Sequence, residues 1–160
     1  MILAIDPGNF LSAYVVLDNK LKPLRFAKIK NEQLLEMIYN HEFDDCNRVA
    51  IEMIASMGMS VGASIFETCV YIGRLKECIW RMLDIEPAVI YRKEEKMNLC
   101  GTMRAKDCNI RTALIDRFGV VGIKKDKGWF YGVHSDIWAA IAVGCTYYDL
   151  YLIEEVEETK

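Results

Sequence analysis

Residues 3–18 read LAIDPGNFLSAYVVLD, two apolar runs separated by a Pro-Gly-Asn turn. Branched and aromatic side chains favour strands, and Pro, Gly and Asn in succession mark a tight turn, so this stretch predicts two antiparallel strands. After the turn residues KLKP, the run LRFAKIK at 24–30 has the same character. The chain is therefore expected to begin with a three-stranded antiparallel meander.

Helical and strand signals then alternate along the rest of the chain. Asn31 stands where a helix N-cap is preferred, and apolar residues after it recur at helical spacing up to residue 40. The runs RVAIEMI at 48–54 and PAVIY at 87–91 predict buried strands. Further helices are expected at 60–83, at 105–119 with Gly119 as the C-cap, and at 135–152, with a loop at 128–135. The pattern predicts an α/β fold with a five-stranded mixed sheet flanked by helices.

Length and composition indicate a single domain over residues 1–160, with a frayed acidic tail at 154–160. Hydrophobic residues make up 52% of the chain, enough to offset the entropy of ordering it. The longest uncharged stretch, 53–66, has 14 residues, whereas a membrane span needs about 18 or more. No basic segment precedes the apolar start, and the six cysteines form no CxxC pair. These features favour a protein of the reducing cytoplasm without a membrane partner.

Positive charge is concentrated in one segment of the chain. The net charge of the whole chain is −3, which by itself argues against a general nucleic-acid-binding protein. Residues 92–127, however, carry a net charge of +5, whereas the rest of the chain carries −8. Such a segment either neutralises nucleic-acid phosphates or forms an ordinary solvated face.

Three acidic residues stand where the predicted elements could bring them together. Asp6 ends the first strand, Glu52 interrupts an apolar strand, and Asp136 opens the last helix. Each alone has a structural explanation, as a turn cap, a compensated buried acid or a helix-start acid. They converge if the first and fourth strands are neighbours and the last helix packs across them. A divalent metal ion would then relieve their repulsion.

Five motifs span nearly the whole chain: IDPG at 5–8, VAIE at 49–52, IGRL at 72–75, AKDCNIR at 105–111 and DIWAAIAVG at 136–144. Together they resemble the RuvC-type Holliday-junction resolvases, particularly the small phage-encoded members. The resemblance implies an RNase H-like fold with sheet order 3-2-1-4-5, and cleavage of branched DNA such as a four-way junction with two Mg²⁺ or Mn²⁺ ions. It implies that Asp6 bridges the ions, that Glu52 and Asp136 complete the ligands, and that the products carry a 5′-phosphate and a 3′-hydroxyl. No nucleotide cofactor is expected.

The chain departs from this family at two positions. Where the family usually has an Asp or His three residues before the last Asp, this chain has Val133. His134 beside it is either a metal ligand or general acid/base, or a plain loop histidine. Where some members use a Phe to open the junction, this chain has Ala55. Met57 and Met59 in the same loop either press on unstacked bases or make core or dimer contacts.

The basic segment supplies the expected contacts to DNA phosphates, namely Arg92, Lys93, Arg104, Lys106 and Arg111. A homodimer is also expected, because a four-way junction offers two strands for cutting at related positions. The apolar segment 60–84 is its candidate interface.

Three other functions come from different classes. A catalytically silent junction-binding protein would keep the fold, but the three intact acids weigh against it. A nuclease of the same fold that acts on structured RNA is compatible with the sequence. A sugar-kinase or actin-like phosphotransferase also begins with an Asp-x-Gly turn, but it needs two such domains around ATP, and the chain has length for one.

Overall fold

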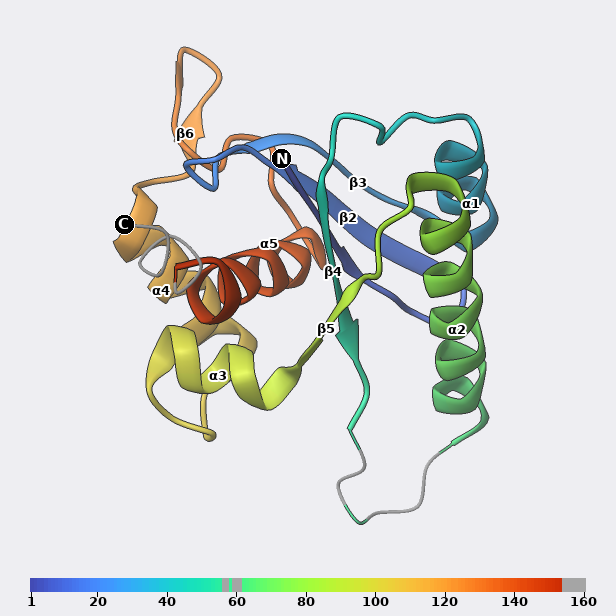
Figure 1. Cartoon of the computed structure of the whole chain (residues 1–160). Coiled ribbons are helices and arrows are strands. Elements are labelled where there is room, and N and C mark those ends of the chain that lie inside the picture. Colours follow the sequence, from blue (N-terminus) through green and yellow to red (C-terminus); the bar gives the residue numbers. More distant parts are fainter. Residues whose placement is uncertain (56–57, 59–61, 154–160) are drawn as a thin grey trace.

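The computed structural model describes residues 1–55, 58 and 62–153. Its main sheet has five strands in the order β3-β2-β1-β4-β5, as predicted (Figure 1). The strands are β1 (Ile2–Asp6), β2 (Leu11–Leu17), β3 (Pro23–Lys30), β4 (Arg48–Met53) and β5 (Ala88–Tyr91). Strand β2 runs antiparallel to both β1 and β3, whereas β4 runs parallel to β1 and β5 runs parallel to β4. The predicted meander and mixed sheet are therefore confirmed.

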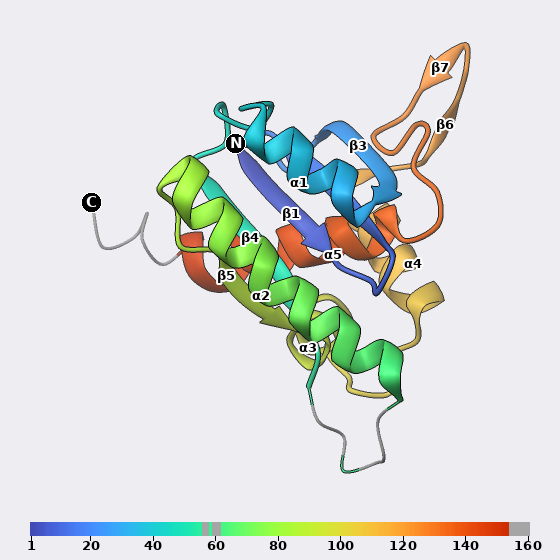
Figure 2. The same ribbon diagram turned by 90° about the vertical axis from the view of Figure 1, so that its right-hand side faces the viewer.

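Helices cover both faces of this sheet. One face carries α1 (Asn31–Tyr39) and α2 (Ala63–Leu83), and the other carries α5 (Ile137–Tyr147), with α3 (Arg92–Cys100) and α4 (Asp107–Phe118) beside it (Figures 1 and 2). Strand β1 serves both layers, because successive side chains point to opposite faces. Ala4 belongs to the core under α5, whereas Leu3 and Ile5 belong to the core under α1 and α2. Each sheet face thus has its own apolar core.

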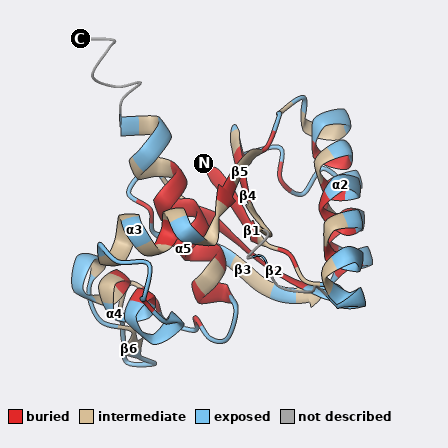
Figure 3. Ribbon diagram, turned by 90° about the horizontal axis from the view of Figure 1, so that it is seen from below, coloured by how far each residue is buried: buried red, intermediate tan, exposed pale blue. Residues whose placement is uncertain are grey.

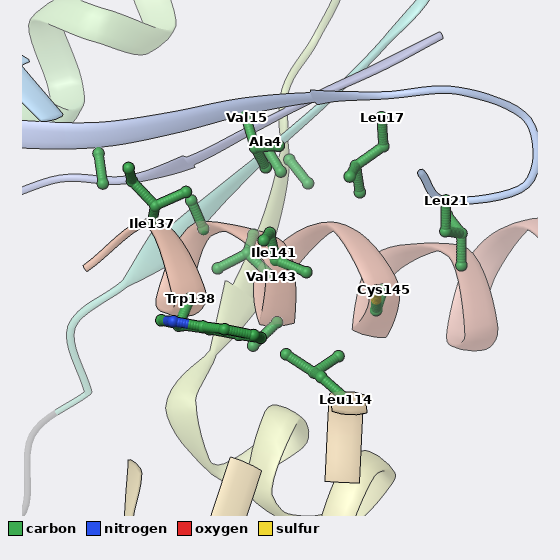
Figure 4. Packing of buried hydrophobic residues seen from close by; sticks show 14 of the residues in the cluster. Ala4, Val15, Leu17, Leu21, Leu114, Ile137, Trp138, Ile141, Val143 and Cys145 are labelled. Atoms are coloured by element: carbon green, nitrogen blue, oxygen red, sulfur yellow. The ribbon is translucent and has the colours of Figure 1, made fainter. Parts of the chain in front are cut away.

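Helix α5 lies deepest in the molecule, and every residue from Ile137 to Tyr147 except Ala139 is buried (Figure 3). Figure 4 shows Ala4, Val15 and Leu17 facing α5 from the sheet, while Leu114 of α4 lies on the other side of the helix. At Gly144 the approach is so close that a Cβ would stand 2.5 Å from Leu17 Cδ1. This packing fixes the start of α5 beside the sheet.

A buried polar network shapes the turn that follows β1. Asn31, expected as an N-cap, is instead the first residue of α1, and its side chain points inward. The Ser12 hydroxyl donates to Asn31 Oδ1 at 2.8 Å, and Asn31 Nδ2 donates to the Gly8 carbonyl at 2.9 Å. A Cβ on Gly8 would stand 2.5 Å from the Leu11 carbonyl oxygen, so only glycine fits this turn. The turn after Asp6 is therefore held at two points.

The structure differs from the predicted elements in three places. Helix α3 was not expected, because its sequence RKEEKMNLC has few apolar residues and only Glu95 is buried in it. A hairpin of two-residue strands, β6 (Gly122–Ile123) and β7 (Asp126–Lys127), projects from the molecule (Figure 1). The last helix ends at Tyr147 and continues as one π-helical turn, Tyr148–Leu152.

Three further sequence predictions concern the cap of α4, the segments outside the described residues and the absence of a membrane span. Gly119 caps α4, as predicted. Met57, Met59 and the tail 154–160 lie outside the described residues. Within the residues that the structure describes, none of the helices combines the length and the apolar character that crossing a membrane requires.

Candidate active site

A cleft of about 240 Å³ opens where β1 and β4 end and α5 begins. Its lining includes all three predicted acids. The residues around it are Asp6, Glu52, Arg92, Asp107, Ile110, Ser135, Asp136, Trp138 and Ala139. Because β1 and β4 are parallel, their carboxyl ends meet at one edge of the sheet, where ligands of α/β folds usually bind.

Asp6 and Glu52 form a closely interacting pair of carboxyl groups in this cleft. The register that pairs Ile5 with Ile51 places the two acids on adjacent strands. Burial first, and then the charge of Glu52 and the hydrogen bond to it, raise the pKa of Asp6 to about 8. Burial also raises the pKa of Glu52, although the positive charge of Arg92 lowers it. Two carboxyls this close favour sharing a proton or binding a cation.

Asp136 reaches the cleft from the N-cap of α5. Ser135 precedes it with a φ of 50°, and the Ser135 hydroxyl donates to Asp136 Oδ1 at 3.1 Å. The other carboxylate oxygen lies 2.5 Å from Lys28 Nζ. The hydrogen bond from Lys28 lowers the pKa of Asp136, so this acid stays ionised beside a lysine.

Lys28 is a site residue that the sequence analysis missed. It lies on β3, two strands away from β1. Ala13 pairs with Asp6 on one side and with Lys28 on the other, so the three residues form a row across the sheet. The pairing register carries this signal, and the sequence predicted the strands without their register.

The donor set suits a hard divalent cation such as Mg²⁺ or Mn²⁺, because it consists of carboxylate oxygens. The close, buried pair of Asp6 and Glu52 supplies the observation, because a cation bound between the two carboxylates would remove their repulsion. In the described residues, no three His, Cys, Asp or Glu side chains stand together closely enough to hold a metal. Asp136 pairs with Lys28 instead. A third ligand from Asp136 therefore requires that this ion pair open.

A second charged group borders the acids. Arg92, the first residue of α3, lines the cleft and pairs with both Glu95 and Asp107. Glu95 is completely buried. Burial first, and then the charge of Glu52, raise the pKa of Glu95 to about 9, although the charge of Arg92 lowers it. Neither Glu95 nor its pairing with Arg92 was predicted, because α3 itself was missed.

Neither of the two residues considered at the fourth ligand position, Val133 and His134, lines the cleft. Val133 is buried in the core under α5. His134 is exposed, its Nδ1 lies 2.9 Å from the Gly132 carbonyl oxygen, and it does not line the cleft. A metal-binding or acid/base role for His134 therefore stays a prediction, and it would need this loop to turn.

The other predicted DNA contacts surround α3 and α4. Arg111 extends over the ring of Trp138 at 4.9 Å, so it stands beside the cleft wall. Arg104 and Lys106 are exposed at the connection into α4, and Lys93 is exposed on α3. The two methionines of the 54–62 connection fall outside the described residues.

Comparison with known proteins shows similarity at the level of structure. No protein-family model matches the chain, and no curated protein matches it. Thermus thermophilus RuvC in complex with a Holliday junction substrate superposes with a TM-score of 0.65 at 15% identity, over 91% of each chain. Another Thermus thermophilus RuvC structure gives a TM-score of 0.67 at 15% identity, over 96% of each chain. The chain therefore has the RuvC-like, RNase H-like fold that its motifs predict.

Proposed function

We propose that the chain is a metal-dependent endonuclease that resolves Holliday junctions and other branched DNA, leaving a 5′-phosphate and a 3′-hydroxyl. One observation carries the proposal: Asp6, Glu52 and Asp136 line one cleft at the carboxyl edge of the sheet. The fold around that cleft is shared with a RuvC whose structure contains a Holliday junction substrate. A cleft that is lined by these three acids, by Asp107 and by Arg92 suits a phosphodiester held next to cations.

In the proposed reaction Asp6, Glu52 and Asp136 would hold two Mg²⁺ or Mn²⁺ ions. Asp6 and Glu52 would have to be deprotonated for this, and the ion pair between Asp136 and Lys28 would have to open. When bound, such ions activate the attacking water and stabilise the leaving 3′-oxygen. Asp6 is well suited to hold the centre, because the turn after it is tied down by Asn31.

The basic residues near α3 and α4 would hold the DNA arms. Arg92 and Arg111 border the cleft, and Lys93, Arg104 and Lys106 extend the positive surface beyond it. Phosphate neutralisation of this kind supplies most of the affinity of non-specific DNA binding. A nuclease acting on cellular DNA fits the cytoplasm that the six unpaired cysteines favour.

One assay tests the proposal against its rivals. Labelled four-way junction, linear duplex and structured RNA are incubated with the protein in Mg²⁺, in Mn²⁺ and in EDTA. We expect symmetric cuts near the junction centre with either metal and none in EDTA. Binding of the junction without any cutting would favour the silent binding protein, and preferential cutting of RNA would favour the RNA nuclease.

We further propose a homodimer that places two clefts on one junction, with α2 at the interface. Phe66 and Val70 of α2 are 61% and 67% exposed, and they border a groove on the side of α2 next to the turn after β1. Ile72, which lies within the predicted interface segment 60–84, is buried against the sheet instead. The exposed part of α2 is therefore smaller than the sequence suggested.

The dimer gives a direct prediction. Light scattering of the wild type at micromolar concentration should give twice the 18.4 kDa of one chain. Phe66→Glu with Val70→Glu should give the monomer mass, because unpaired charges are costly in an apolar interface. Leu24→Glu with Val120→Glu, at exposed positions outside α2, is the matched control and should stay dimeric. A wild-type mass near one chain, with and without junction DNA, would contradict the proposal.

The ion pair of Lys28 with Asp136 gives a second prediction. Lys28→Met should tighten Mn²⁺ binding about two- to fivefold, because Asp136 no longer exchanges an ion pair worth up to about 1 kcal/mol for the metal. Lys30→Met removes the same charge two residues along β3 and should change the affinity less. Calorimetric titration with Mn²⁺, without DNA, measures both. Equal affinities of Lys28→Met and the wild type would show that the pair does not compete with the metal.

A further inference from the structure

Arg92 is held from both sides by carboxylates in opposite surroundings. Its Nη1 donates to Glu95 Oε2 at 2.5 Å, and its Nη2 donates to Asp107 Oδ1. The side chain of Glu95 is 0% exposed, whereas that of Asp107 is 89% exposed. The inner contact is therefore inaccessible to solvent, and the outer contact lies in water.

Glu95 occupies a position that burial alone does not explain. A carboxyl without access to water is costly, and an apolar residue would fit α3 at lower cost. Glu95 Oε1 has no hydrogen-bond partner within the described part of the chain, so the single contact of this carboxyl is the one to Arg92. Oε2 can accept from Arg92 whether or not Oε1 carries a proton. The role of Glu95 is to fix the guanidinium.

Asp107 makes the weaker of the two contacts. An exposed carboxylate gains little from an ion pair, because water solvates it almost as well. The guanidinium group binds a phosphate with the same fork that binds a carboxylate. Arg92 and Asp107 both line the cleft that contains Asp6 and Glu52. A phosphodiester entering this cleft thus meets an arginine whose outer nitrogen is already paired with an exchangeable anion.

We infer that Arg92 binds the phosphodiester inside the acidic cleft by exchanging Asp107 for a phosphate oxygen, while Glu95 acts as the positioning residue that holds Arg92 in place. This inference rests on the proposed nuclease function and specifies how its site receives the substrate. Asp107 therefore competes with the phosphate for the guanidinium of Arg92. Because Arg92 stays tied to Glu95, the guanidinium does not follow the departing carboxylate into solvent.

Junction binding in EDTA separates the three roles without cleavage. We expect Asp107→Asn to tighten binding severalfold, because the competitor is lost. Asp116→Asn removes the same charge from an exposed position of the same helix and should change binding less. Arg92→Lys keeps the charge but loses the fork, and it should weaken binding severalfold. Equal effects of Asp107→Asn and Asp116→Asn, or unchanged binding by Arg92→Lys, would overturn the inference.

A double-variant comparison tests the positioning role. Glu95→Met should weaken junction binding in the wild-type chain and have no further effect when Arg92→Met is already present, because Glu95 acts through Arg92. Thermal unfolding of each variant checks the fold, and Glu95→Gln replaces Glu95→Met if the latter unfolds. Equal weakening by the Glu95 change in both backgrounds would overturn the positioning role. A wild type that binds neither junction, duplex nor RNA would overturn the proposed function itself, and this inference with it.

Discussion

Asp6→Asn and Glu52→Gln should each lower the rate of junction cleavage by about a thousandfold or more, while junction binding persists or becomes tighter. Metal ions in such sites stabilise the transition state by several kcal/mol, and each 1.36 kcal/mol corresponds to a tenfold change in rate. When these acids are ionised, each substitution also removes one negative charge from the cleft and so reduces its repulsion of phosphate. Single-turnover cleavage and junction binding, measured on the same preparation, test both halves of the prediction.

Stability against pH provides a control that needs no DNA. The pKa of Asp6 is raised to about 8 in the folded chain, whereas the pKa of Asp in an unfolded chain is about 3.9. The folded state therefore binds the proton of Asp6 more tightly than the unfolded state does. The contribution of Asp6 to the free energy of unfolding falls as the pH rises between these two pKa values. In EDTA, the melting temperature of Asp6→Asn should be higher than that of the wild type at pH 8 and nearly equal to it at pH 4. Near-normal cleavage by either variant would refute the assignment of the site.

Replacing Arg104, Lys106 and Arg111 together with Ala should flatten the salt dependence of junction binding by about three units of slope. Each phosphate contact contributes a slope of about 0.9 when affinity and salt concentration are both logarithmic. Cleavage by saturating protein should suffer much less, because these residues bind phosphates away from the cut. Folding should survive, since Ile110 and Leu114 still bury the inner face of α4.

The hairpin offers a matched control for this triple variant. Lys124, Lys125 and Lys127 carry the same charge on the exposed β6–β7 hairpin and its turn. Their replacement by Ala should leave most of the slope intact if the surface around α3 and α4 is the binding surface. An unchanged slope in the folded α4 variant would mean that its positive residues form only a solvated face.

The sequence predicted the strands and three acids of the cleft from local signatures, whereas the strand order was implied by the resemblance to the RuvC-type resolvases. A period of two with flanking turn residues identifies strands. An acid within an apolar run such as VAIEMI indicates a function, because a buried carboxylate is costly. Two other residues near the site were harder to predict. Lys28 joins the site through strand register, a contact between distant segments that composition and spacing do not encode. Glu95 pairs with Arg92 within one helix, but that helix has almost no apolar periodicity, so no sequence pattern indicated it.

Trp138 gives the cleft an optical reporter. Its indole forms part of the cleft wall, packs on Phe130 at 4.8 Å between ring centroids and carries Arg111 over its face. A phosphate that draws Arg111 away removes a cation from the ring, and indole emission responds to charge close to it. Trp80 is exposed on α2 and Trp129 stacks on Phe118, so both can be changed to Phe away from the cleft. In that background the emission of one residue would follow substrate arrival in real time, separately from the cut.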